Sequence, residues 1–546
     1  MPISHRRRLA APAVLVAATL LLSACSAAAS TTESTPESPV PGGTLRLSYS
    51  ADTASCIDPN QVSFIENRGI TRNFTDSLTD QDPETGEIVP WLATDWTVSD
   101  DATEFVFTLR DGVTFSDGTA LDATAVKTAY DGIVALGAAS YLGISYLAGY
   151  QSTEVVDDDT VKVTFATPNV SFLQATSTTT LGILSPATYA KTAEERCAGD
   201  LVGSGLFVLD SYVANTEAVL SRRDGYAWPS ALVENQGESY LDGIQVSYVP
   251  EDSVRVGNLI SGGTDLAWPR TPISEADQAR IEAEGGTIES RSLPGNAQGY
   301  IPNVKNGGPL ADVKVRGAIT KAIDYDSYAS TVFWDGYPVV SSAYDTSTPS
   351  YADNSELLAF DPEGAAELLD DAGWRVGDDG YRYKDGEKLT LVFPTTAAGI
   401  GDQLIQAQLK EVGIDLVLDV VTQAVATERL AAGDYDLTVR YQTRADPSVL
   451  ASVLDQSISK APIAQNSQDA ATAAEVSRLF DEGFAAVESA ERDTVYAELQ
   501  SYLIEQGVVF PYQERVLYLA RSEAVHGFAL TSESMLRAND IWLSQS

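Results

Sequence analysis

The sequence predicts an α/β protein with two large lobes or about three domains. Strand and helix patterns alternate along the chain, which is typical of sheets covered by helices. Hydrophobic residues make up 44% and charged residues 21% of the chain, as in an ordinary globular protein. The length of 546 residues exceeds that of a usual single domain.

Short segments with alternating apolar positions predict the strands. The first such segment follows a pair of glycines, and similar segments recur along the chain. The predicted strands are Thr44–Tyr49, Glu104–Leu109, Thr160–Phe165, Ile244–Tyr248, Leu389–Phe393 and Ile414–Val420.

Two helices between these strands carry clear end signals. Asp361 can cap a helix over Ala365–Ala372, with Pro362 in its first turn and Gly373 at its end. A second helix is predicted over Leu404–Val412, which a glycine closes.

The charge and the scarcity of histidine exclude several functions. The formal net charge is −42, so the surface repels phosphate backbones and anionic lipid headgroups, and we expect no nucleic-acid partner. His5 lies near the N-terminus, which leaves His526 as the other of only 2 histidines. Most histidine-based catalysis and metal binding is therefore excluded.

The N-terminus has the pattern of an export signal. A basic head at Arg6–Arg8 precedes the apolar run Leu9–Ala24, which predicts a signal peptide over residues 1–24. Leu22–Cys25 resembles the bacterial lipobox, so we expect Cys25 to carry a lipid that anchors the protein to the outer face of the cell membrane. The alternative is an ordinary signal peptide with an incidental cysteine. Residues 25–41, rich in Ser, Thr and Pro, indicate a flexible tether.

Cys56 and Cys197 are the two cysteines that follow this leader. Export to an oxidising compartment favours a disulfide between them. The alternative is a pair of separate buried thiols.

Motifs of catalysis are missing from the sequence. It contains no HExxH, GxSxG, P-loop or GxGxxG pattern, and a Ser-His-Asp triad would have to use His526, which we interpret as a surface residue. Asp80–Gly86 fits a turn better than a calcium loop. We therefore assign no catalytic residue, metal or cofactor, and a secreted hydrolase such as a glycosidase remains the alternative from another class.

Two adjacent segments resemble a known family. Glu87–Trp96 and Phe105–Gly118 are similar to the signature of family 5, the peptide/nickel-type extracellular solute-binding proteins of ATP-binding cassette importers. The likeness continues in order through Val202–Phe207, Leu259–Leu266, Asn303–Asp324 and Asp361–Trp374.

The resemblance implies a two-lobed fold of the periplasmic-binding-protein type II, with ligand held in the cleft. The expected boundaries are residues 42–295 for lobe I, with an inserted subdomain at about 91–199, then 296–508 for lobe II and 509–546 for the return to lobe I. The implied function is capture of an oligopeptide or related small solute by a monomer and its delivery to an importer's permease and ATPase. A signalling receptor would share this fold.

The expected ligand segment departs from the family pattern. Peptide-binding members have a Trp-x-x-Asp-x-x-Asp-Pro segment, whose first Asp pairs with the ligand's ammonium. Alignment on Asp446 and its following proline places Thr443 at the position of that acid and Arg440 at the position of the aromatic residue. Asp446 itself also fits a plain helix cap.

We therefore hypothesise that Arg440, with Arg444 as a second candidate, binds an acidic group of the ligand. A ligand with a free amine at that end is then less expected. Trp268, Tyr441 and Asn296 are further candidates for the cleft wall, although each also fits core or hinge packing. The chain offers few soft ligands for nickel, but a metal held through an organic chelator stays open.

Overall fold

The computed structural model describes residues 38–544. The predicted signal peptide, the lipid anchor at Cys25 and nearly all of the predicted tether lie outside the described residues. Among residues 38–544, no helix combines the length and the apolar character that a membrane span requires.

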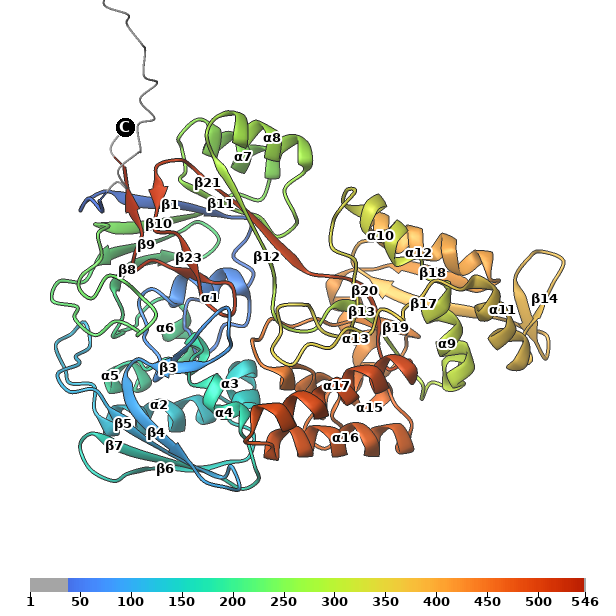
Figure 1. Ribbon diagram of the computed structural model, residues 1–546, viewed down its shortest axis with the longest axis horizontal. Coiled ribbons are helices and arrows are strands. Elements are labelled where there is room, and N and C mark those ends of the chain that lie inside the picture. Colours follow the sequence, from blue (N-terminus) through green and yellow to red (C-terminus); the bar gives the residue numbers. More distant parts are fainter. Residues whose placement is uncertain (1–37, 545–546) are drawn as a thin grey trace, which may run out of the picture. The chain divides into compact units, whose positions relative to one another are not determined.

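The first lobe comprises residues 42–292 and 516–544 and contains a seven-stranded sheet (Figure 1). Its strands are β1 (Thr44–Tyr49), β8 (Phe207–Val213), β9 (Glu217–Arg222), β10 (Gly243–Tyr248), β11 (Leu266–Trp268), β12 (Thr287–Ser292) and β21 (Val516–Arg521). The strand order is β12-β21-β11-β1-β10-β9-β8, and β1 runs parallel to both β10 and β11. As the apolar alternation predicts, Leu45, Leu47 and Tyr49 of β1 are buried.

A second sheet and several helices complete the first lobe. The four antiparallel strands are β4 (Ala93–Val98), β5 (Glu104–Leu109), β7 (Thr160–Phe165) and β6 (Tyr150–Val155), in that spatial order. The remaining elements are α1 (Ile65–Thr71), α2 (Ala123–Leu136), α3 (Tyr141–Tyr146), α4 (Ser171–Ala175), α5 (Pro186–Tyr189), α6 (Ala193–Cys197), α7 (Asp252–Ile260), α8 (Glu275–Ala283), β2 (Thr79–Gln81) and β3 (Ile88–Pro90). Phe172 of α4 joins the second sheet to this lobe's core, because its ring packs edge-on against Phe105 at 5.0 Å.

The second lobe comprises residues 298–513 and has its own hydrophobic core. Its strands include β13 (Gln298–Pro302) between β19 (Leu437–Val439) and β20 (Phe510–Gln513), and the parallel pair β17 (Thr390–Thr395) and β18 (Asp415–Val420). The helices around them are α9 (Val313–Ala322), α10 (Tyr325–Val332), α11 (Pro362–Asp371), α12 (Ile400–Glu411), α13 (Gln423–Ala432), α14 (Ala451–Leu454), α15 (Pro462–Asn466), α16 (Ala470–Ala485) and α17 (Ser489–Glu505). Asp361 caps α11, Pro362 is its first residue, and Gly373 follows its end, as the sequence predicts.

Two short connections join the lobes. One leads from β12 to β13 through residues 293–297, and the other leads from β20 to β21 through residues 514–515. Phe510–Gln513 pairs with β13 of the second lobe, whereas the sequence predicts the return to the first lobe from residue 509. The chain then ends in two small pairs, β22 (Val525–His526) with β25 (Trp542–Leu543) and β23 (Ala529–Leu530) with β24 (Leu536–Arg537).

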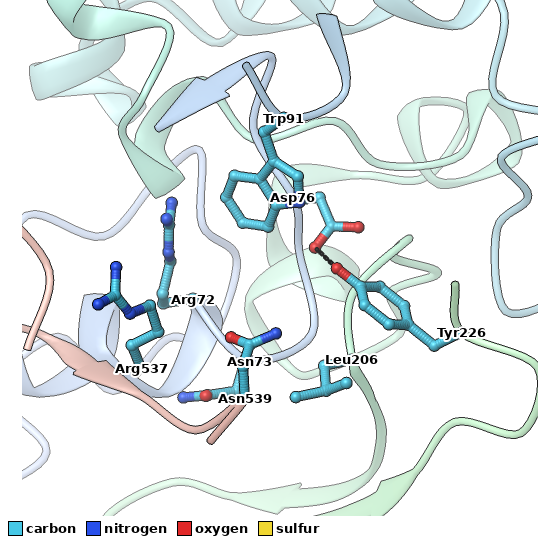
Figure 2. A pocket seen from close by; sticks show the side chains of 8 residues that line it. All are labelled: Arg72, Asn73, Asp76, Trp91, Leu206, Tyr226, Arg537 and Asn539. Carbon is cyan, nitrogen blue, oxygen red and sulfur yellow. Dashed lines mark hydrogen bonds between the residues drawn. The ribbon is translucent and has the colours of Figure 1, made fainter. Parts of the chain in front are cut away.

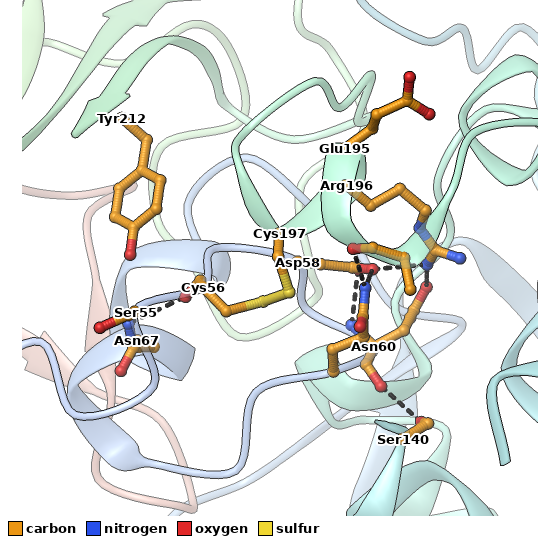
Figure 3. The surroundings of a disulfide bond; sticks show 12 residues. Ser55, Cys56, Asp58, Asn60, Asn67, Ser140, Glu195, Arg196, Cys197 and Tyr212 are labelled. Carbon is orange, nitrogen blue, oxygen red and sulfur yellow. Dashed lines mark hydrogen bonds and ion pairs between the residues drawn. A yellow bond between two sulfur atoms is a disulfide. The ribbon is translucent and has the colours of Figure 1, made fainter. Parts of the chain in front are cut away.

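The structure joins Cys56 to Cys197 in a disulfide with an S–S distance of 1.98 Å (Figure 3). The bond fastens the segment after β1 to the end of α6. Asp58 and Arg196 lie beside it and form a buried ion pair at 2.8 Å. The first lobe is therefore cross-linked close to the chain that leads into α1.

Candidate functional site

A cavity of about 380 Å³ lies between the two lobes. This volume is within the range of about 300 to 1,000 Å³ that is usual for small-molecule sites. Both lobes and both connections contribute side chains. The lining residues are Ser63–Glu66, Tyr141–Leu142, Trp268–Pro272, Leu293, Gln298, Val439–Thr443, Gln513 and Arg515–Tyr518.

The second-lobe wall is the segment Arg440–Thr443, which follows β19. Asn296 holds this segment, because its Nδ2 donates to the Arg440 carbonyl at 3.0 Å and its Oδ1 accepts from the Gln442 N–H at 2.9 Å. Asn296 is itself buried and does not line the cavity. The structure therefore places this predicted site residue behind the wall, where it positions Arg440 and its neighbours.

The Arg440 side chain is exposed at the cavity and lies 5.4 Å above the Tyr141 ring of the first lobe. No ion pair links its guanidinium to a carboxylate within the described part of the chain. Tyr441, which is 48% exposed, lies beside it at the cavity. This wall therefore presents a cation whose hydrogen-bonding capacity is available to a ligand.

Thr443, a predicted site residue, lines the cavity. Its hydroxyl accepts a hydrogen bond from Arg515 Nη1 at 3.0 Å. Arg515 is paired in turn with the buried Asp345 at 2.6 Å. Arg515 thus places a second, internally paired guanidinium beside Thr443 at the cavity.

Arg444 points away from the cavity. It is buried, with its guanidinium 4.4 Å above the Tyr146 ring. Asp446 is also buried, accepts a hydrogen bond from the Ser448 N–H at 2.9 Å and so acts as a cap. Of the candidates near the expected ligand segment, the structure brings Arg440, Tyr441 and Thr443 together at the cavity and leaves Arg444 outside it.

The first-lobe wall includes charged residues that the sequence analysis missed. Glu66, in the first turn of α1, is 2% exposed, and its Oε1 lies 3.1 Å from Nε of Arg270. Burial raises the pKa of the Glu66 carboxyl, and the Arg270 charge opposes this rise. Trp268 also lines the cavity, but its ring is buried 5.5 Å from that of Tyr49, so most of it packs in the core. No local motif marks Glu66 or Arg270, which lie far apart in the sequence.

Direct hydrogen bonds also join the two lobes, and one of them lies at the cavity. Gln81 Nε2 donates to the Ala445 carbonyl at 3.0 Å, and Gln442 Nε2 donates to the Tyr141 hydroxyl at 2.8 Å. Between residues that do not line the cavity, the Val170 N–H donates to the Phe484 carbonyl at 3.0 Å. A solute in this cavity would be enclosed by both lobes.

A second cavity, within the first lobe, holds only about 10 Å³, close to the space of one water molecule (Figure 2). The Tyr226 hydroxyl donates to Asp76 at 3.4 Å, as Figure 2 shows, and Trp228 Nε1 donates to the same carboxylate at 3.0 Å. Burial raises the pKa of Asp76 to about 6. The size of this cavity excludes a peptide-sized solute, so the interlobe cavity is the candidate site.

Within residues 38–544, no group of three or more His, Cys, Asp or Glu is arranged to hold a metal ion. His526, interpreted above as a surface residue, stacks on Trp542 with ring centroids 4.1 Å apart.

Comparison with known proteins places the chain in a family. The model of the bacterial extracellular solute-binding proteins, family 5 Middle, matches residues 87–461, which is more than half of the chain. The chain is 28% identical over 362 residues to the glutathione-binding protein GsiB of Salmonella paratyphi A, and the match covers 66% of each protein. This is just under two thirds of the length of that relative.

Solved structures show the same fold. NikA from Brucella suis in complex with Fe(III)-EDTA superposes with a TM-score of 0.78 at 23% identity, covering 92% of this chain and 100% of that one. The oligopeptide-binding protein AppA from Bacillus subtilis, in complex with a nonapeptide, gives 0.75 at 20% identity, with 93% and 100% covered. The two-lobed α/β fold and the family resemblance that the sequence predicts are confirmed, and the chain belongs to family 5 of the bacterial extracellular solute-binding proteins.

Proposed function

We propose that this protein captures a small, acidic, peptide-like solute in the interlobe cavity and delivers it to the permease of an ATP-binding cassette importer. The observation that carries the proposal is the lining of this cavity by both lobes. A solute that contacts both walls stabilises the closed arrangement of the lobes, and a permease can distinguish the closed from the open form. The protein itself then performs no chemistry on its solute.

The charges of the second-lobe wall support an acidic solute. Arg440 reaches the cavity without a carboxylate partner among the described residues, and Arg515 donates to Thr443 beside it. A guanidinium binds a carboxylate with charge-assisted hydrogen bonds in a fixed planar geometry. Glutathione, which the curated relatives are named for binding, carries two carboxylates and is a suitable first probe.

The roles of the remaining candidates follow from their positions. We propose that Tyr441, Thr443 and Trp268 contact the solute, and that Asn296 orients the wall from behind. Arg444 lies outside the cavity and is proposed only to support the wall.

Attachment to the membrane is proposed from the sequence alone. Residues 1–24 would be removed and Cys25 lipidated, so that the protein stays at the outer face of the cell membrane as a monomer. Mass spectrometry of the protein purified from membranes tests this, because a lipidated Cys25 adds the mass of the acyl chains to the first peptide.

A titration of the cavity tests the proposed function. Glutathione and an equimolar pool of di- to pentapeptides are titrated into the purified protein by calorimetry, and the bound solute is then recovered and weighed by mass spectrometry. We expect binding, recovery of unchanged solute, and a loss of about tenfold in affinity for acidic probes on Arg440→Gln. The matched control is Arg375→Gln, which removes an exposed arginine of β14 (Arg375–Val376) away from the cavity.

Three results would overturn the proposal. The absence of binding to glutathione and to the whole pool would refute a peptide-like cargo. Recovery of a cleaved or otherwise altered solute would favour the hydrolase alternative. Equal affinities of the wild type and the Arg440→Gln variant for acidic probes would show that Arg440 does not bind the solute.

A further inference from the structure

Glu66 is a buried carboxylate whose hydrogen bonds are incomplete. Its side chain is 2% exposed at the cavity wall, and neither carboxylate oxygen has a hydrogen-bond partner among residues 38–544. The contact with Arg270 Nε at 3.1 Å supplies charge but does not satisfy both oxygens. A buried carboxylate without donors is costly, so a site of this kind fits a ligand that supplies N–H groups.

Arg270 has N–H groups that lack acceptors among the described residues, which complements the lack of donors at Glu66. It lines the cavity, is 46% exposed and lies 5.5 Å above the Phe64 ring. Its terminal nitrogens donate no hydrogen bond to another described residue, whereas a guanidinium has five N–H groups to offer. The pair therefore presents an anion and a cation side by side to the same cavity.

An α-amino acid group matches this pair, because its ammonium and its carboxylate are attached to the same carbon. The ammonium has three donors for the Glu66 oxygens, and the carboxylate can take two N–H groups of a guanidinium. The opposite wall carries Arg440, which reaches the cavity without a carboxylate partner among the described residues. The cavity thus has a zwitterion-binding side on the first lobe and a cationic side on the second.

We infer that Glu66 and Arg270 bind the free α-amino acid end of the solute, and that Arg440 binds an acidic group at its other end. This inference rests on the proposed function and narrows its ligand class to γ-linked or side-chain-linked peptides, which keep a free ammonium and carboxylate on one carbon. An ordinary α-linked peptide offers its terminal ammonium to Glu66 but has no carboxylate next to it for Arg270.

Three probes separate these contacts: γ-Glu-Cys-Gly, its N-acetyl derivative and its α-linked isomer. They are titrated by calorimetry into the wild type, Glu66→Gln and Arg270→Gln. Glu289→Gln is the control, because Glu289 also pairs with an arginine of the first lobe, at 2.7 Å, but does not line the cavity. Melting temperatures without probe show whether each variant folds.

We expect Glu66→Gln to lower the affinity for the γ-linked probe about 10- to 100-fold and to leave the affinity for the acetylated probe unchanged. Arg270→Gln should lower the affinity for the γ-linked probe more than the affinity for its α-linked isomer. The control should bind all probes as the wild type does. A melting temperature of Glu66→Gln equal to or above that of the wild type is expected, because the variant no longer buries a charge.

The inference and the proposed function fail in different ways. If the wild type binds the free and acetylated probes equally, or if Glu66→Gln weakens both to the same extent, the assignment of Glu66 is wrong while the solute-binding function stands. If Arg270→Gln affects both linkages equally, the zwitterion site is wrong. If the wild type binds none of the probes and nothing from the peptide pool, the proposed peptide-like cargo is refuted and this inference with it.

Discussion

Replacing Asp446 by asparagine tests how the cavity wall is supported. Asp446 follows the wall segment and caps the short turn Pro447–Leu450. Its carboxylate accepts two hydrogen bonds from Arg492 of α17, at 3.0 and 2.9 Å. The same Arg492 nitrogen donates to Ser171 of the first lobe at 2.6 Å. One buried ion pair thus supports both the wall and a contact between the lobes.

The expected loss of stability follows from the ion pair between Asp446 and Arg492. Burial alone raises the pKa of the Asp446 carboxyl, but Arg492 and Arg444 outweigh it and lower the pKa from 3.8 to about 2. This difference corresponds to about 2 kcal/mol of stability, which is present above pH 3.8 and is lost as the pH falls through about 2. Asp446→Asn also leaves Arg492 without its anion, so we expect a loss of about 3 kcal/mol at neutral pH.

Differential scanning calorimetry can resolve the second lobe, because each lobe has its own hydrophobic core. A loss of about 3 kcal/mol lowers the melting temperature of a lobe of this size by about 6 to 12 °C. Asp455→Asn is the matched control, since Asp455 is a buried carboxylate of the same lobe with no ion pair among the residues described. The reasoning is refuted if Asp446→Asn melts within 1 °C of the wild type or if Asp455→Asn costs as much.

Two further predictions concern the disulfide and the pH dependence of binding. Replacing Cys56 and Cys197 by serine opens a loop of 141 residues and should lower the stability of the first lobe by about 5 kcal/mol in the entropic model. Calorimetry should show this as a lower melting temperature of the first lobe, and an unchanged melting temperature would contradict the prediction. Affinity for the free-amine probe should fall on acidification, beginning above pH 4.5, because only the ionised Glu66 carboxylate binds an ammonium. Burial raises the pKa of Glu66; the charge of Asp52 adds to this rise, and the charge of Arg270 opposes it. Calorimetric titrations between pH 4 and 8 check this, and Glu66→Gln should remove the dependence.

The sequence predicts those parts of the fold that local patterns determine. The strand over Thr44–Tyr49 and the capped helix after Asp361 appear at the expected places, because apolar alternation and end signals are properties of neighbouring residues. The pairing of Phe510–Gln513 with β13, which lies about two hundred residues earlier in the chain, is not indicated by the local sequence. Pairing over such distances leaves no mark in the local pattern.

The same limit applies to the candidate site. A family pattern locates Arg440 and Thr443 at the cavity, but it does not show that Arg444 turns toward Tyr146. Glu66 and Arg270 belong to no motif, and only the fold brings them within 3.1 Å of each other. One signal was present in the sequence: Arg270 closely follows Trp268, which was itself a candidate for the wall.

The charge of the whole protein determines where specificity can arise. A chain with a net charge of −42 repels an anionic solute at long range, but salt screens that repulsion beyond about 8 Å at physiological ionic strength. Inside the cavity, Arg440 acts over a few ångströms with less screening. Recognition of an acidic solute therefore depends on a few short, well-oriented contacts. Without Arg440, one fewer positive charge would oppose the repulsion between the solute and the acidic surface.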